Sequence, residues 1–372
     1  MANDVIEDRS DTLEWANGHD PKRLPEPVRR AFSALDCEFE IRGLQGGLLN
    51  QSFHVRTREV EYVLQRVSDV FSPEIHNNIQ SVTTHLKKRG IVCAGLVPNI
   101  DGGLVADLGE AGCWRLMPHL GGTSFETIQS IAQAHSAGLL VGRFHAAMLD
   151  FDSPLAPLGI PYRETASYLD SLRVALVDHS SHRLADEMGE LGRLVLQQFA
   201  DWGAPVEVPH RVIHGDLKLS NLLFEDHEPP GRDIAFALID LDTLMRGPLW
   251  IELGDAWRSW CDLRTDDPTE IRFDLEVFEH SLVGFLKGLG TGLSHTERDS
   301  LVMAPERIAL ELCARFVTDA LEETYFAWDD STYATRGDHN AARAVRQWKL
   351  CESMQATRTE REAILHRLTQ EK

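Results

Sequence analysis

Short apolar runs, separated by glycines and polar turns, fill the part of the chain before residue 118. Alternation of apolar and polar positions within these runs predicts strands. One interruption, from Pro73 to Gly90, has apolar residues three and four positions apart and two lysines in its last turn, which indicates a helix. The expected strands cover residues 39–44, 52–57, 62–67, 97–100, 104–107 and 113–117.

Helical spacing of apolar residues dominates after Pro118. The exception is residues 210–243, where two apolar runs flank a turn-rich segment and predict a β-hairpin inserted among helices. The pattern divides the chain into an N-terminal extension over residues 1–36, a β-rich N-lobe over 37–118 and a helical C-lobe over 119–372. The helices of the C-lobe are expected over residues 126–149, 183–202, 275–289, 305–327 and 338–368.

The charge balance of the chain excludes some partners. Its 372 residues hold 37 lysines and arginines against 58 aspartates and glutamates, a formal net charge of −21. Nucleic acids and anionic membranes attract proteins through basic surfaces, so we expect neither as a partner. No apolar stretch is long enough for a membrane-spanning helix, and the first residues lack the pattern of a signal peptide. We therefore expect a cytoplasmic protein, and the sequence does not specify its oligomeric state.

The segment His-Gly-Asp-Leu-Lys-Leu-Ser-Asn at residues 214–221 carries the strongest chemical signal. A predicted strand delivers Asp216 into a loop, Asn221 opens the next strand, and the hairpin returns Asp240 beside them. Phosphoryl transfer needs a carboxylate that orients the attacking hydroxyl and accepts its proton. It also needs oxygen ligands that hold Mg²⁺ against the nucleotide phosphates. We assign the first role to Asp216 and the metal site to Asn221 and Asp240.

These motifs, in this order and at hairpin spacing, resemble the catalytic loop HxDxxxxN and the metal-binding I-D-x-[DE] stretch of the aminoglycoside phosphotransferase and choline kinase superfamily. The resemblance implies an α+β fold, the bilobal protein-kinase-like fold with a small β-rich N-lobe and a larger helical C-lobe. It also implies ATP and Mg²⁺ as cofactors and an alcohol group as the phosphate acceptor. Lys218 matches the lysine that lies near the transferred phosphate in protein kinases, so we expect a catalytic role for it. The alternative is a surface lysine.

The same resemblance places nucleotide contacts in the N-lobe. Gly46 and Gly47 lie between the first two strands, where such kinases keep a loop over the phosphates, although a plain hairpin turn also explains them. The third strand carries Gln65 and Arg66 where a protein kinase has a lysine. Because successive side chains of a strand alternate between its faces, only one of the two can face the nucleotide. We favour Arg66 for its charge.

The junction between the lobes is the expected adenine site. Arg115 and Met117 fall at this junction, and we expect both to contribute to nucleotide binding. In this fold adenine bonds to the backbone, which side chains do not reveal, and a surface position explains Arg115 equally well.

Further segments are similar to the N-acetylhexosamine 1-kinase branch of the superfamily, which phosphorylates the anomeric hydroxyl of N-acetylglucosamine or N-acetylgalactosamine. The similar segments are residues 47–53, 62–67, 78–86, 239–245 and 314–319. The resemblance implies a small-molecule sugar as substrate. A solvated polar helix face is the alternative explanation for the stripe that holds Arg315. The candidate sugar contacts are Asp242, Thr243, Arg315 and Tyr325.

Two rival functions stay open. One is a kinase of the same fold for another small alcohol, such as an aminoglycoside, choline, homoserine or a different sugar. A cationic acceptor demands unpaired carboxylates, whereas a neutral sugar needs balanced donors and acceptors such as Arg315 and Thr243. The other rival is a non-catalytic nucleotide- or partner-binding module, and the presence of Asp216, Asn221 and Asp240 argues against it.

Overall fold

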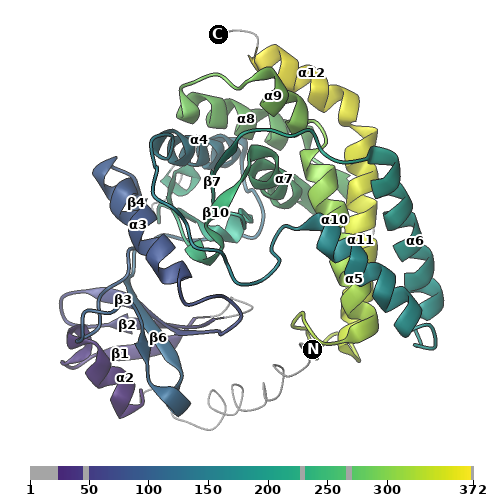
Figure 1. Cartoon of the computed structure of the whole chain (residues 1–372). Helices are drawn as coiled ribbons and strands as arrows, with labels where there is room; N and C mark the ends of the chain where they lie inside the picture. Colours follow the sequence, from purple (N-terminus) through teal and green to yellow (C-terminus); the bar gives the residue numbers. More distant parts are fainter. Residues whose placement is uncertain (1–23, 45–49, 227–230, 265–269, 370–372) are drawn as a thin grey trace.

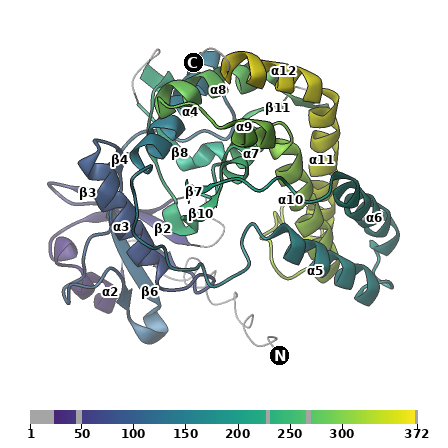
Figure 2. The ribbon, with the colours of Figure 1, turned by 45° about the horizontal axis from the view of Figure 1, so that its top comes forward.

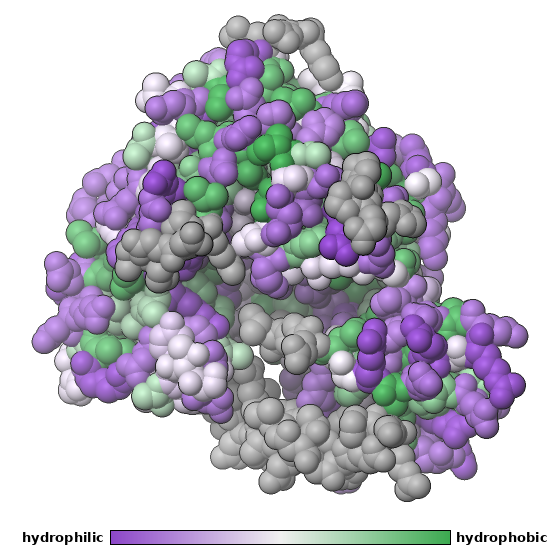
Figure 3. Space-filling model, turned by 180° about the vertical axis from the view of Figure 1, so that it is seen from behind, coloured by the Kyte–Doolittle hydropathy of each residue, from purple (hydrophilic) through white to green (hydrophobic). Residues whose placement is uncertain are grey.

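The computed structural model describes residues 24–44, 50–226, 231–264 and 270–369. Figure 1 shows two lobes, a small one built on a sheet and a larger one that is mostly helical. Seen from behind, the surface is hollowed where the two lobes meet (Figure 3). The architecture is the α+β, two-lobed arrangement that the sequence predicts. Among the described residues, no helix is both long enough and apolar enough to cross a membrane.

An antiparallel sheet of five strands forms the N-lobe. The strands are β1 (Glu40–Gly43), β2 (Gln51–Arg56), β3 (Glu61–Val67), β5 (Ala106–Asp107) and β6 (Cys113–Pro118). Their order across the sheet is β1-β2-β3-β6-β5. One face of the sheet packs on the short helix α2 (Glu26–Ala31), and Val28 and Phe32 share a buried cluster with Leu64 and Trp114. Part of the segment that we expected as an N-terminal extension therefore contributes to the N-lobe core.

Helix α3 (Ile75–Lys88) joins the two lobes. In Figures 1 and 2 it lies between the sheet and the C-lobe, and its buried residues Ile79 and Leu86 belong to the C-lobe core. The next strand, β4 (Val92–Cys93), pairs in parallel with β9 (Ala235–Leu238) of the C-lobe. The helix predicted between Pro73 and Gly90 thus forms, and it is packed against the larger lobe.

The C-lobe surrounds small antiparallel strand pairs with helices. Its helices are α4 (Ile131–Ala147), α5 (Thr165–Asp178), α6 (Ala185–Trp202), α7 (Leu249–Trp260), α8 (Leu275–Leu289), α9 (His295–Leu301), α10 (Ala304–Glu322), α11 (Arg336–Ala356) and α12 (Arg358–Thr369). Its remaining strands are β7 (His210–Ile213), β8 (Leu222–Phe224), β10 (Met245–Pro248), β11 (Asp262–Arg264) and β12 (Ile271–Phe273). Strands β8 and β9 form the predicted hairpin, and β7 pairs with β10. Helix α10 packs on α5, α6, α7 and α11, which makes it the central helix of the lobe.

Helix α7 is the main element that the sequence pattern does not predict. Its polar residues Glu252, Asp255, Arg258 and Ser259 recur three and four positions apart, but other parts of the protein cover this face, and Glu252 and Asp255 are buried. Helix α5 is also absent from the expected elements, and the long helix expected over residues 338–368 is divided at Thr357 into α11 and α12. The strand expected over residues 97–100 is reduced to a single bridge between Val97 and Leu116.

Helices α4 and α8 touch backbone to backbone. Gly138 and Gly142 of α4 face Gly284 and Gly288 of α8, and a Cβ at any of the four would overlap backbone atoms of the other helix. At Gly142 an added Cβ would lie 2.7 Å from the amide nitrogen of Leu289, well inside van der Waals contact. The close approach of the two helices therefore depends on these glycines.

We predict that Gly142→Ala lowers the free energy of unfolding by about 1–3 kcal/mol, because overpacking at this contact outweighs the small gain in helix propensity. Urea unfolding followed by circular dichroism measures the change. Gly292→Ala is the matched control, since nothing lies within 4 Å of a Cβ there, and its effect should stay within about 0.5 kcal/mol. Equal stability of the two variants would contradict the prediction.

Candidate functional site

Asp216 lies in the loop after strand β7, and the hairpin brings three other predicted site residues to it. Asn221 donates from Nδ2 to Asp216 Oδ2 at 3.0 Å, and Lys218 Nζ lies 3.2 Å from the same oxygen. The amide of Ile239 donates to the carbonyl of Asn221 at 3.0 Å, which sets the following residue, Asp240, beside Asn221. A carboxylate, an ammonium group and a potential pair of metal ligands thus meet in one place.

Negative charge is concentrated in this loop. The side chain of Asp240 reaches solvent inside the cleft, yet the protein around it partly desolvates it and, together with the neighbouring Asp242 carboxylate, raises the pKa of Asp240. Burial would lower the pKa of Lys218, but the charges of Asp216 and Asp240 outweigh it and raise that pKa. Lys218 therefore stays protonated. A further cation beside Asp240 would relieve the repulsion between the carboxylates.

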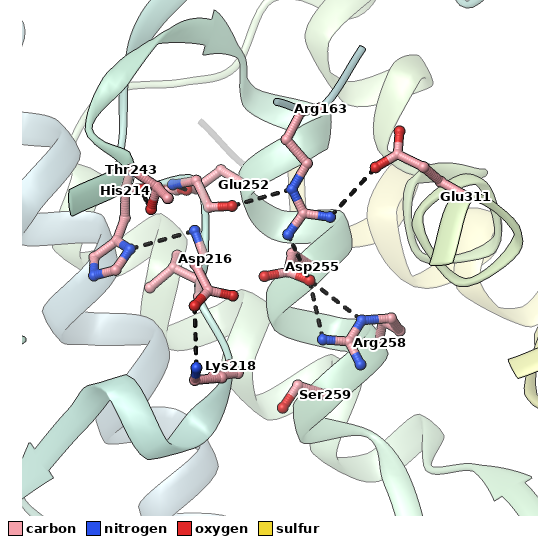
Figure 4. Close-up of polar contacts among 12 residues, drawn as sticks. Arg163, His214, Asp216, Lys218, Thr243, Glu252, Asp255, Arg258, Ser259 and Glu311 are labelled. Carbon is pink, nitrogen blue, oxygen red and sulfur yellow. Dashed lines mark hydrogen bonds and ion pairs between the residues drawn. The ribbon is translucent and has the colours of Figure 1, made fainter. Parts of the chain in front are cut away.

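The carboxylate of Glu252 fixes the backbone immediately before Asp216. It is fully buried on α7, and its two oxygens accept hydrogen bonds from the amides of His214 and Gly215 at 2.9 and 3.0 Å. Figure 4 labels Glu252 beside His214 and Thr243, close to Asp216. From α4, His145 Nε2 lies 3.3 Å from Glu252 Oε1. The amides of the loop therefore have no freedom to turn.

The carbonyl groups of His214 and Gly215 also accept hydrogen bonds from side chains. Thr243 Oγ1 donates to the carbonyl of His214 at 2.7 Å, and Arg163 Nε donates to the carbonyl of Gly215 at 3.1 Å. Gly215 has a φ of 84° and a Cβ there would lie 2.8 Å from the carbonyl of Thr243, so only glycine suits this position. His214 itself donates from Nε2 to the carbonyl of Ile239, which gives it a structural role.

Arg115 and Asp242 form a buried ion pair between the lobes. Arg115 donates from Nη1 and Nη2 to the two oxygens of Asp242 at 2.6 and 3.0 Å, and neither side chain is more than 5% exposed. Asn50 donates to Asp242 at 2.8 Å, and Gln65 accepts from Arg115 Nε at 2.8 Å. Although burial opposes it, the charge and hydrogen bonds of Arg115 lower the pKa of Asp242. Arg115 is therefore neither a surface residue nor free.

The structure places Gln65, and not Arg66, on the face of the sheet that looks toward Asp242. Gln65 pairs across the strands with Arg115, whereas Arg66 pairs with Trp114 on the opposite face and packs against Gly112. Strand alternation allows one of the two to face the cleft, and the choice of Arg66 was wrong.

The other expected nucleotide contacts have different outcomes. Met117 lies on the same face as Arg115, two positions along β6, and packs against the C-lobe core at the junction. Gly46 and Gly47 lie outside the described residues.

Of the four expected sugar contacts, Asp242 and Thr243 are occupied within the protein, as described above. Arg315 and Tyr325 lie together on the C-lobe side. The Arg315 guanidinium carbon is 4.8, 5.6 and 5.2 Å from the ring centres of Tyr168, Tyr325 and Phe326. Among the described residues, no carboxylate or other hydrogen-bond acceptor pairs with this guanidinium, and its contacts are with these three rings.

The helix stripe around Arg315 is not a solvated face. Glu311 is 1% exposed, accepts from Thr165 Oγ1 at 2.5 Å and lies 3.5 Å from Arg163. Asp319 is also buried and accepts from the amides of residues 324, 325 and 326, which fixes the turn that carries the aromatic rings. Only Glu322 is exposed.

Several residues of the site are not apparent from the sequence. Arg163 is buried, has a φ of 57°, and joins Gly215 to Asp255 and Glu311. Glu252 lies in a segment that we did not expect to be helical. Two acidic residues three positions apart, Glu252 and Asp255, in the otherwise apolar stretch over residues 249–257 are the signal that could have indicated it.

Comparisons with known proteins agree on the family. The model of the phosphotransferase enzyme family matches residues 40–280. The homoserine kinase of Methylobacillus flagellatus is 25% identical over 250 residues, which are 67% of each chain. Among solved structures, a microcompartment-associated aminopropanol kinase is similar with a TM-score of 0.59 and 16% identity, over 89% of this chain and 96% of that one. Spectinomycin phosphotransferase, solved with ADP and spectinomycin, has a TM-score of 0.56 and 13% identity, over 95% and 99%.

These structural likenesses confirm the bilobal protein-kinase-like fold. The family match covers the sheet, the catalytic loop and α7, and it ends before α10, which carries Glu311 and Arg315. The chain belongs to the phosphotransferase enzyme family, and it is a phosphotransferase with an alcohol group as acceptor.

Proposed function

We propose that the protein is an ATP- and Mg²⁺-dependent kinase that phosphorylates the anomeric hydroxyl of an N-acetylhexosamine. The observation that carries the reaction is the convergence of Asp216, Lys218, Asn221 and Asp240 in one loop and hairpin. The resemblance of residues 314–319 and their neighbours to the N-acetylhexosamine 1-kinase branch supports the acceptor.

The residues of the loop suit the roles of phosphoryl transfer. Asp216 accepts the proton of the attacking hydroxyl and orients it, while Lys218, charged and 3.2 Å away, neutralises negative charge beside it. Asn221 donates through Nδ2 to Asp216, and no hydrogen bond to its Oδ1 is formed by the described residues. Asn221 Oδ1 and the carboxylate of Asp240 would hold Mg²⁺, which when bound neutralises the nucleotide phosphates.

The nucleotide would lie under the cleft face of the N-lobe sheet. Met117 and the backbone at the lobe junction would contact adenine, and Arg115, oriented by Gln65 and paired with Asp242, would help to shape the base of the cleft. The ADP in the spectinomycin phosphotransferase structure supports an adenine nucleotide as donor.

The aromatic residues around Arg315 suit a sugar. Tyr168, Tyr325 and Phe326 offer flat apolar surfaces, and Arg315 offers several N–H donors in a fixed plane. The hydroxyl of Tyr162 and Arg163 Nε both donate to the carbonyl of Gly215, and Arg163 lies 3.5 Å from Glu311, one helical turn before Arg315. The proposed acceptor site would therefore adjoin Asp216.

Homoserine is the second candidate acceptor. The similarity to a homoserine kinase favours it, and so does the unpaired guanidinium of Arg315, which could bind a carboxylate. Arg315 would contact a negatively charged carboxylate in homoserine but a neutral group in an N-acetylhexosamine. Substitution of Arg315 therefore distinguishes them.

We predict that, with MgATP, the protein releases ADP in the presence of N-acetylglucosamine or N-acetylgalactosamine and forms an acid-labile product, as expected of an anomeric phosphate. For a neutral sugar, Arg315→Gln should lower kcat/KM about 2- to 10-fold, whereas for homoserine the loss of a charge-assisted bond should lower it about 10- to 100-fold. Arg173→Gln, on an exposed face of α5, is the control. Turnover of homoserine alone would reject the sugar assignment and keep the kinase.

We predict that Asp216→Asn lowers kcat about 10²- to 10⁴-fold, because the variant has no base, and leaves the affinity for MgATP within about twofold. An asparagine oxygen can still accept from Asn221, so the loop should keep its shape. Single-turnover kinetics and calorimetric nucleotide binding measure the two effects. Asp330→Asn, an exposed change, should alter neither. Undiminished turnover of Asp216→Asn would contradict its role as base.

We predict that Asp240→Asn abolishes the stabilisation by MgATP without weakening the protein in its absence. The folded-state pKa of Asp240 is raised, so its ionised form costs stability above that pKa, and its φ of 61° suits asparagine. With MgATP at about a hundredfold its Kd, wild type should gain about 2.7 kcal/mol in thermal or urea unfolding and the variant almost none. An equal gain in both would remove Asp240 from the metal site.

A further inference from the structure

A cluster of two histidines and a glutamate lies on the N-lobe sheet, apart from the catalytic loop. His54 belongs to β2, Glu61 begins β3, and His119 directly follows the last residue of β6. His54 Nε2 lies 2.8 Å from Glu61 Oε2, His119 Nδ1 lies 3.5 Å from the same oxygen, and the two imidazole centres are 4.5 Å apart. One ligand atom from each residue lies within 4.8 Å of the others. These separations suit three ligands of one small cation.

The types of donor in the cluster select a transition metal. Zn²⁺ and similar ions bind two imidazoles and a carboxylate in open sites, whereas Mg²⁺ prefers oxygen ligands alone. The side chain of His54 is 3% exposed, while those of His119 and Glu61 are 28% and 36% exposed, so the site has a buried floor and an open side. An ion could enter from solvent, and water could complete its coordination.

We propose that His54, Glu61 and His119 form a binding site for a divalent transition-metal ion such as Zn²⁺ at the junction of the lobes. The ion replaces the proton that His54 Nε2 donates to Glu61 in its absence. Arg42 Nε donates to His54 Nδ1 at 3.1 Å, so Arg42 must turn away when that proton moves to Nδ1. Arg42 is exposed on β1, which allows it to do so. Arg56 keeps its bond to the other oxygen of Glu61.

The proposed metal site lies where the chain passes from the N-lobe sheet to the C-lobe, so a bound ion would restrain the connector between the lobes. Beyond His119, the chain enters the C-lobe at Thr123, which exchanges two backbone hydrogen bonds with Phe224 at 2.9 Å each. His54 pairs across the sheet with Val63, and Val63 pairs with Met117. A bound ion would tie the connector between the lobes to the strands beside the proposed adenine site.

The test uses the full-length protein, freed of metal, with excess Mg²⁺ and without nucleotide. We expect titration with Co²⁺ to give one equivalent of binding with the visible absorption of a four-coordinate site. His119→Ala and His54→Ala should each weaken binding at least about tenfold. Because His54 is buried, His119→Ala is the decisive variant should His54→Ala fail to fold.

Three further variants control the measurement. His295→Ala removes an exposed histidine of α9 and should bind as wild type does. Asp240→Asn should also bind normally, which separates this site from the catalytic one. Arg42→Glu should bind more tightly, since a carboxylate can accept the Nδ1 proton of His54.

Thermal unfolding with Zn²⁺ provides a second measurement. The ion should raise the Tm of wild type and of His295→Ala but not that of His119→Ala. Absence of Co²⁺ binding, or equal binding by wild type and His119→Ala, would overturn the proposal and leave a hydrogen-bonded cluster only. Neither outcome depends on the acceptor, so the proposed kinase function is tested separately.

Discussion

The bond between the Glu252 carboxylate and two successive amides is the interaction on which the active site depends. Each oxygen of the carboxylate accepts from one amide, Oε1 from His214 and Oε2 from Gly215, so one side chain holds both amides together. Both amides are buried, so loss of an acceptor would leave an unsatisfied donor. Because Glu252 belongs to α7, these two bonds fix the backbone before Asp216 relative to that helix. Asn221, at the start of the hairpin, is in turn bonded to Asp216.

A second constraint joins the lobes. Arg115 and Asp242 are far apart in the sequence, yet each compensates the buried charge of the other. Removing one alone would leave an uncompensated ion in the interior, which is far more costly than removing both. Protein kinases bring a cation to this cleft on the third strand. Here Gln65 lies on the cleft face of that strand and accepts a hydrogen bond from Arg115 of β6, whose charge is paired with Asp242.

The sequence predicts those site residues that lie close together along the chain. Asp216, Lys218 and Asn221 occur within six residues, and the hairpin pattern is enough to bring Asp240 to them. Contacts between distant segments carry no such pattern, which is why the partners of Arg115 and the role of Glu252 were not expected. Which of Gln65 and Arg66 faces the cleft depends on the register of β3 in the sheet. The charge of Arg66 does not reveal that register, and the prediction based on it was wrong.

The glycine contact between α4 and α8 has a consequence for the active site as well as for packing. Helix α4 carries His145, whose ring lies against the carboxylate of Glu252. Because backbone touches backbone, the depth of α4 in the lobe is set by atoms that cannot change rotamer. A relative with a larger residue at one of these four positions would have to hold its helices farther apart and support the catalytic loop from a different distance. The glycines therefore help to set the position of Asp216, the residue that we propose as the base.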